Sequence, residues 1–212
     1  MFGGMRTSHP FLGRTGTNLG AAVLFVVSAV ALLTAVVLPV NQLTQPGGSV
    51  TVQVADAGED RSLDLAGLPE DVRVVDPTDE SQLVAADLPA GLRALTELPA
   101  SLNAIAVAVG AWLLARVLWA IHDGHPFDRR NPGRLAGLAA AVVLGGLVVP
   151  MAEGVVATAV LEHLDLAGPG SPLVLFEVTL PLTPIGLALA LLAAAEAFRR
   201  GRALEDEVEG MV

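Results

Sequence analysis

The chain has 212 residues, of which 53% are hydrophobic and 16% charged, and its formal net charge is −10. A soluble globular domain usually carries about a quarter of its residues as charges, so this composition argues against a soluble protein. There is no cysteine, which excludes disulfides, thiol catalysis and cysteine-ligated metal or iron–sulfur sites.

The first long apolar run, from Leu19 to Val40, contains no charged residue. About 20 helical residues cross a hydrocarbon core roughly 30 Å thick, and backbone amides in lipid must pair within their own segment. The run therefore predicts a membrane-spanning helix over residues 19–42. Its end, Val37–Val40, offers no small-x-small cleavage site, so we expect an uncleaved span rather than a signal peptide.

Residues 43–100 have a different character, and they hold eleven of the 22 acidic residues. Ser49–Ala55 alternates valine with polar residues, which is typical of a half-buried strand. Leu63–Leu65 and Val72–Val75 are further short strand candidates, and residues 79–98 favour short helical turns. We expect a small β-containing domain whose own core is marginal, so that it leans on a partner, a second copy or the membrane surface.

Three more apolar runs predict the second, third and fourth spans, at residues 101–121, 135–161 and 173–198. Before the third, Asn131 is a favourable N-cap and Pro132 suits the first helical position. The predicted fold class is therefore an all-α membrane protein. It is a four-transmembrane-helix bundle with a small β-containing domain between its first and second helices.

The arginines predict the orientation of this bundle. Nine lie at one side of the predicted spans: Arg6, Arg14, Arg116, Arg129, Arg130, Arg134, Arg199, Arg200 and Arg202. Three lie at the other side: Arg61, Arg73 and Arg93. Loops and termini that are rich in arginine and flank membrane-spanning helices stay in the cytoplasm. We therefore expect a multi-pass protein of the cell (cytoplasmic) membrane with both termini inside. The cytoplasmic segments are residues 1–18, 122–134 and 199–212, and the extracytoplasmic ones are the acidic domain at 43–100 and the loop at 162–172.

Two acidic residues in the predicted spans, Glu153 and Glu177, form a candidate intramembrane polar site. An ionisable group in hydrocarbon costs several kcal/mol by most scales and usually faces protein or a water-filled cavity. A cation, proton or ligand site is one interpretation, with nearby prolines loosening the helices. The alternative is that these long spans carry both carboxylates to the outer membrane interface.

Two further polar groups leave alternatives open. Arg116 and Glu196 could form an interhelical ion pair, or each could extend to the headgroups from its own span. The loop from His122 to Asp128 holds two histidines and two aspartates, but this spacing is a weak metal signal. A tight turn anchored by Pro126 and Phe127 is the better interpretation, so no metal site is predicted.

The end of the chain predicts a short amphipathic helix. Leu204, Val208 and Met211 recur at helical spacing between acidic residues. Such a helix could bind a cytoplasmic protein. For a single chain, packing onto the arginine-rich loop at 122–134 is the better interpretation, because the charges are opposite.

Two spaced motifs resemble a known family. They are Gly124-x-Pro126-Phe127 with Asn131-x-x-Arg134-Leu135, and Glu196-x-Phe198-x-x-Gly201-x-x-Leu204 with Glu209-Gly210-x-Val212. In order and side of the membrane they resemble the bacterial membrane-protein family catalogued as domain of unknown function 2975. The resemblance implies four spans, an extracytoplasmic segment after the first, and, for some members, a small helix-turn-helix regulator encoded nearby. The candidate cytoplasmic face consists of Arg116 and nine residues of these motifs, namely Gly124, Pro126, Phe127, Asn131, Arg134, Glu196, Phe198, Gly201 and Leu204.

No phosphate-binding loop, nucleophile motif, zinc motif or basic nucleic-acid patch is present in the sequence. We therefore expect no enzyme activity, no cofactor and no direct nucleic-acid binding. The expected function is that of a sensor or regulatory membrane protein, whose partners are the lipid bilayer, a cytoplasmic regulatory protein and, in a homo-oligomer, further copies. Two alternatives are a small channel or transporter that uses Glu153, and an envelope-protection protein.

Overall fold

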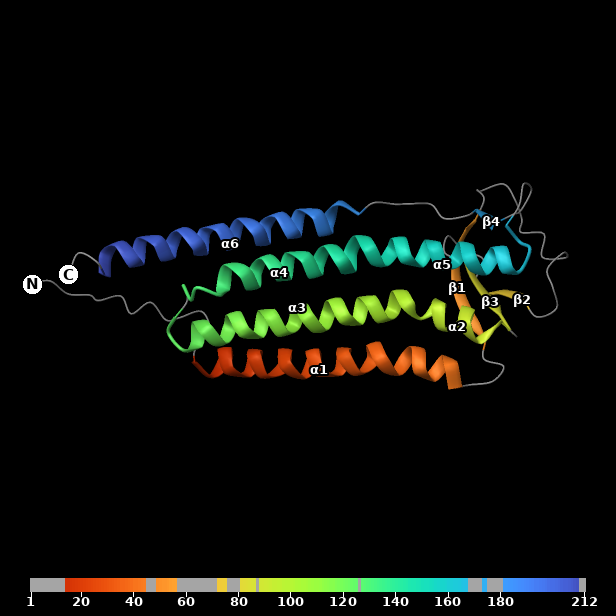
Figure 1. The fold of residues 1–212 in the computed structure, drawn as a ribbon, viewed down its shortest axis with the longest axis horizontal. Helices are drawn as coiled ribbons and strands as arrows, with labels where there is room; N and C mark the ends of the chain where they lie inside the picture. Colours follow the sequence, from red (N-terminus) through yellow and green to blue (C-terminus); the bar gives the residue numbers. More distant parts are fainter. Residues whose placement is uncertain are drawn as a thin grey trace, which may run out of the picture. The chain divides into compact units, whose positions relative to one another are not determined.

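The structure is a computed structural model, and most of its described residues are helical (Figure 1). The described residues are 14–44, 49–56, 72–75, 81–86, 88–125, 127–167, 173–174 and 181–209. The helices are α1 (Arg14–Thr44), α2 (Ala90–Thr96), α3 (Leu98–His122), α4 (Asn131–Val143), a π-helical turn η2 (Leu144–Val148), α5 (Val149–His163) and α6 (Leu182–Glu209).

Four helical stretches are long and apolar enough to cross a membrane, as the sequence predicts. The first lies within α1 and the last within α6, and the other two consist of α2 with α3 and of α4 through α5. Helices of this length and composition indicate a multi-pass membrane protein.

The fourth helix begins later than predicted. It starts at Leu182, whereas the sequence pattern starts the span at Leu173. Pro181 lies just before the helix, and Pro184 is in its first turn, where a missing N–H breaks no helical hydrogen bond. Leu173 and Val174 instead form a short strand, because their backbone pairs with the strand that follows α1.

The helices contribute to two compact units, which are described separately. Unit 1 contains the described residues within 1–30, 107–142 and 186–212, and unit 2 contains those within 31–106 and 143–185.

Unit 2 contains an antiparallel sheet in the order β2-β3-β1-β4. Its strands are β1 (Val50–Asp56), β2 (Val72–Val75), β3 (Ser81–Ala85) and β4 (Leu173–Val174). The strands predicted near Ser49–Ala55 and at Val72–Val75 are confirmed. The strand β3 lies where only short helical turns were expected, and α2 matches one such turn. The predicted strand at Leu63–Leu65 lies outside the described residues.

The sheet has a core because it packs on α5. Val50 and Val52 are buried while Thr51 between them is exposed, which is the alternation expected of a strand with one covered face. The covered face meets Val160 and Leu161 of α5, which are 0% and 1% exposed. This packing supplies the support that so small a sheet requires.

The helical stretch that ends in α5 is unusually long and contains the π-turn η2. It runs for 33 residues, or about 50 Å, which exceeds the roughly 30 Å of a hydrocarbon core. Pro150 follows η2 and donates no backbone N–H. The turn includes Gly146, where a Cβ would overlap the Pro184 ring of α6. Because Pro150 lacks a backbone N–H and α6 approaches closely at Gly146, the helix has a physical reason for an irregular turn at this point.

Unit 1 is held together by contacts of α1 with α3 and by a cluster that α3, α4 and α6 share. Ser28 of α1 donates a 2.8 Å hydrogen bond to the Ala108 carbonyl of α3, and one turn earlier Phe25 meets Trp119 edge to face at 5.8 Å. A buried cluster joins the other three helices through Val117 of α3, Leu135 of α4 and Ala195 of α6.

Candidate functional site

The α3–α4 connection and the facing part of α6 bring together half of the predicted cytoplasmic face. We call this arrangement the loop–α6 face. It consists of Phe127, Asp128, Asn131 and Arg134 from the connection and the start of α4, together with Phe198 and Gly201 from α6. All six residues belong to unit 1.

The connection begins with a glycine-terminated helix end. The Gly124 N–H donates to the Ile121 carbonyl, and the His125 N–H donates to the Ala120 carbonyl. Gly124 has φ of +81°, the left-handed conformation that glycine adopts without steric cost. This is the Schellman arrangement, which ends α3 and turns the chain toward α6. It gives the first glycine of the motif a structural role. Pro126 lies outside the described residues.

Phe127 is packed directly against α6. Its ring centroid lies 5.8 Å from that of Phe198, with an interplanar angle of 55°. A Cβ added at Gly201 would lie 2.6 Å from Phe127 Cε1, a distance that real Cβ atoms do not tolerate. Gly201 therefore makes room for the aromatic ring, which explains a glycine in the interior of a helix where it costs roughly 1 kcal/mol relative to alanine.

Asn131 and Arg134 form the polar support beneath this packing. Asn131 is 0% exposed and is the first residue of α4, whereas the sequence takes it as the preceding cap. Its Oδ1 accepts a 2.8 Å hydrogen bond from Arg134 Nη1, which also donates at 3.1 Å to the Arg116 carbonyl. One guanidinium group thus ties the start of α4 to α3.

Asp128 completes this network, although it is not among the predicted site residues. Its Oδ1 accepts a 2.8 Å hydrogen bond from the Arg130 backbone N–H, and its Oδ2 lies 4.0 Å from Arg134 Nη1. The Arg130 backbone N–H and the neighbouring arginine charges hold the pKa of Asp128 below its ordinary value of 3.8. The Asp-x-Arg spacing at residues 128–130 is a sequence signal for such a side-chain turn.

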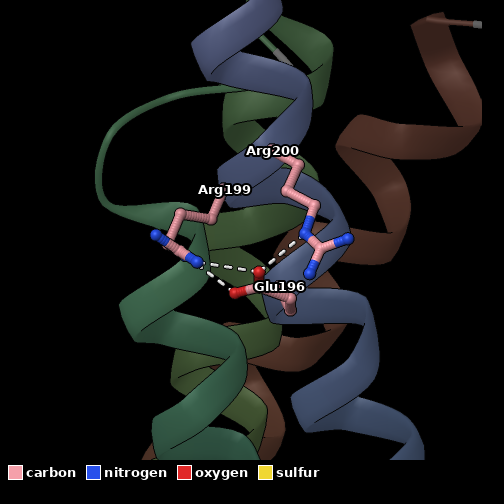
Figure 2. A network of polar contacts seen from close by, with 3 residues as sticks. All are labelled: Glu196, Arg199 and Arg200. Atoms are coloured by element: carbon pink, nitrogen blue, oxygen red, sulfur yellow. Dashed lines mark hydrogen bonds and ion pairs between the residues drawn. The ribbon is translucent and has the colours of Figure 1, made fainter.

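Glu196 and Arg116 do not pair in the described contacts. Glu196 accepts hydrogen bonds from Arg199 Nε at 2.7 Å and from Arg200 Nε at 2.8 Å, both on its own helix (Figure 2). The Arg116 guanidinium instead lies 5.7 Å from the centre of the Trp112 ring. Glu196 therefore orients two exposed arginines of α6.

Beyond the loop–α6 face, α6 continues without a break to Glu209. The Leu204 side chain is 63% exposed, and Glu205 and Glu207 are exposed too. A continuous helix does not fold back, and the described side chains at 203–205 and 207 are exposed, so they do not pack onto the arginine-rich loop, the arrangement that the sequence favours. The end of α6 presents Leu204 on an open surface.

The histidines of the connection have no metal-binding arrangement in the described chain. His122 Nδ1 lies 3.1 Å from Thr17 Oγ1, a hydrogen bond that joins the end of α3 to α1. Among the described residues there is no group of three or more potential metal ligands.

Glu153, the main intramembrane candidate, lies on α5 in unit 2. It is exposed, as are Met151 and Val155 close to it in sequence, at 51% and 68%. The carboxylate is therefore not enclosed by the described part of a single chain. Glu177 lies outside the described residues.

The loop–α6 face therefore combines an aromatic ring packed on α6 and oriented guanidinium groups, and an exposed helix end follows it. Comparisons with protein-family models, with curated proteins and with solved structures found no match.

Proposed function

We propose that the chain is a regulatory protein of the bacterial cytoplasmic membrane whose loop–α6 face and exposed α6 end bind a soluble cytoplasmic protein. The observation that carries the proposal is the contrast along α6. At Phe198 and Gly201 the helix is locked to the connection, and within one turn Leu204 is exposed. An apolar side chain on a rigid helix is the kind of anchor that partner proteins bind, because little conformational entropy is lost on binding.

The partner we favour is a small helix-turn-helix regulator. This choice rests on the resemblance of the two motifs to the family catalogued as domain of unknown function 2975. The protein would act without chemistry of its own, by holding or releasing the regulator in response to its outer domain. The buried Asn131–Arg134 network supports such a role, because it links the connection to α3 and so to the membrane-spanning part.

The orientation belongs to the same proposal. Both termini are cytoplasmic and the sheet is outside, because nine of twelve arginines flank the cytoplasmic ends of the spans. A chain without cysteine allows a clean test. In intact cells, a membrane-impermeant maleimide should label Thr51→Cys and not Leu204→Cys. Labelling of Leu204→Cys alone would reverse the orientation and remove the proposed partner.

The binding test is a crosslinking pull-down from native membranes with two chains, one intact and one truncated after Arg202. This truncation retains Gly201 and its contact with Phe127, so only the exposed end is lost. We expect the intact chain alone to capture a soluble DNA-binding protein. Capture of the same proteins by both chains would exclude the α6 end as the binding surface.

A further inference from the structure

The end of unit 1 that carries the loop–α6 face is strongly basic. Residues 116–134 and 196–202 contain seven arginines and three carboxylates. The contact between Phe127 and Gly201 brings these two segments together. The arginine pairs at 129–130 and 199–200 therefore lie at the same end of unit 1.

Two of the three carboxylates in these segments are already engaged inside the cluster. Asp128 faces the Arg130 backbone and Arg134, and Glu196 is bound by Arg199 and Arg200. The side chains of Arg199 and Arg200 nonetheless remain 69% and 77% exposed. Glu196 thus orients both guanidinium groups, accepting also from Arg199 Nη2 at 2.8 Å, and Arg129 and Arg130 are exposed as well.

Exposed apolar side chains come before both arginine pairs in the sequence. Trp119 and Ile121 near the end of α3 are 48% and 39% exposed, and Leu192 of α6, two turns before Arg199, is 46% exposed. Exposed apolar residues followed by arginines, with a tryptophan near the end of α3, are the pattern of spans that leave the hydrocarbon for the headgroup layer. Guanidinium groups bind phosphate oxygens in a planar, two-pronged geometry.

We propose that Arg129, Arg130, Arg199 and Arg200 form a binding surface for the phosphate groups of anionic phospholipids. The charge order along α6 supports a lipid as the ligand. Along α6 toward the C-terminus, Arg199 and Arg200 come before the acidic residues Glu205, Glu207 and Glu209, which follow within the next three turns. An anionic leaflet attracts the arginines and repels the acidic turn, so bound lipid holds the exposed end of α6 away from the membrane. The surface requires no protein partner and does not rest on the proposed regulatory function.

The test is native mass spectrometry of the full-length chain in detergent, with equimolar phosphatidylglycerol and phosphatidylcholine. We expect the wild type to retain phosphatidylglycerol preferentially. Arg199→Gln/Arg200→Gln and Arg129→Gln/Arg130→Gln should each lower this preference by about thirtyfold, since each of the two arginines removed contributes about 1 kcal/mol near an anionic surface. The matched control Arg61→Gln/Arg73→Gln removes the same charge from the segment between the first and second spans and should retain the wild-type preference.

Three results would overturn the proposal. An equal loss in the control variant would show that only net charge matters. Displacement of the lipid by millimolar inorganic phosphate would identify the ligand as free phosphate. Unchanged lipid preference, with concentration-dependent self-association that the Arg199/Arg200 variant abolishes, would assign the arginines to the acidic α6 end of a second copy.

Discussion

The Phe127 ring occupies the space that a side chain at Gly201 would fill. The two residues are 74 positions apart, and their contact joins the α3–α4 connection to α6. Because the same ring also meets Phe198, the connection is fixed at two successive turns of one helix. The start of the exposed α6 end is therefore set by packing rather than by the end of a helix.

Gly201→Ala should weaken this junction. The added Cβ pushes the Phe127 ring away, and overpacking of this kind typically costs about 1–3 kcal/mol. Gly186→Ala is the control on the same helix, because nothing lies within 4 Å of its added Cβ. Thermal unfolding in detergent should show a lower Tm for Gly201→Ala and an equal or higher Tm for Gly186→Ala. Equal Tm values for Gly201→Ala and the wild type would contradict the contact.

Asn131→Ala should destabilise the start of α4. The change removes the fully buried Asn131 side chain, whose Oδ1 accepts a hydrogen bond from the Arg134 guanidinium. A buried donor left without its acceptor costs about 1–3 kcal/mol, and a charged donor costs more. Asn103→Ala, at an exposed position of α3, serves as the control and should change the free energy of unfolding little. Urea titrations in mixed micelles give the comparison. Two variants of the same stability would show that the buried hydrogen bond contributes nothing.

The sequence predicts the spans well and their contacts poorly, and the reasons are physical. A charge-free run such as Leu19–Val40 is helical in lipid whatever its neighbours, so α1 could be predicted. Leu173 and Val174 suit a helix or a strand equally, and their pairing with distant β1 decides between the two. An unexplained glycine within a helix pattern, Gly201, was a signal of close packing, but its partner depends on which helices are neighbours.

The same limit applies to the polar part of the site. The sequence singled out Asn131 and Arg134 through their motif and interpreted Asn131 as a cap. Their actual hydrogen bond needs both side chains on one turn of α4, together with the Arg116 carbonyl from another helix. Asp128 was missed as a site residue because its role depends on the backbone conformation at Arg130.

Gly146→Ala should disturb the π-turn η2. The added Cβ would overlap the rigid Pro184 ring, which cannot rotate away, so we expect a loss of about 1–3 kcal/mol. At neighbouring Gly145 the added Cβ meets only the Asn103 Oδ1 atom at 3.5 Å and the Ala106 Cβ at 3.6 Å. Gly145→Ala should therefore be milder. Tm values measured side by side test this order, and the reverse order would refute the packing of Pro184 on η2.

We expect the ionised carboxylate of Asp128 to stabilise the fold, and protonation at low pH to remove this stabilisation. Because its folded pKa is below the ordinary value of 3.8, the charged form stabilises the fold. This contribution is fully present well above pH 3.8 and is lost as the pH falls from that value through the folded pKa. Asp128→Asn should therefore lower the Tm at pH 6, and its difference from the wild type should shrink as the pH approaches 3. A difference that stays constant over this range would mean that the carboxylate charge has no role.

The most direct test of the proposed binding surface is site-specific photocrosslinking in native membranes, with the photoreactive residue at position 204 in one chain and at position 192 in another. Leu204 and Leu192 are both exposed on α6, at 63% and 46%, but only Leu204 lies beyond the Phe127 contact. The account predicts that position 204 captures a soluble DNA-binding protein and that position 192 captures lipid or membrane protein only. The same soluble protein captured at both positions, or at neither, would contradict it.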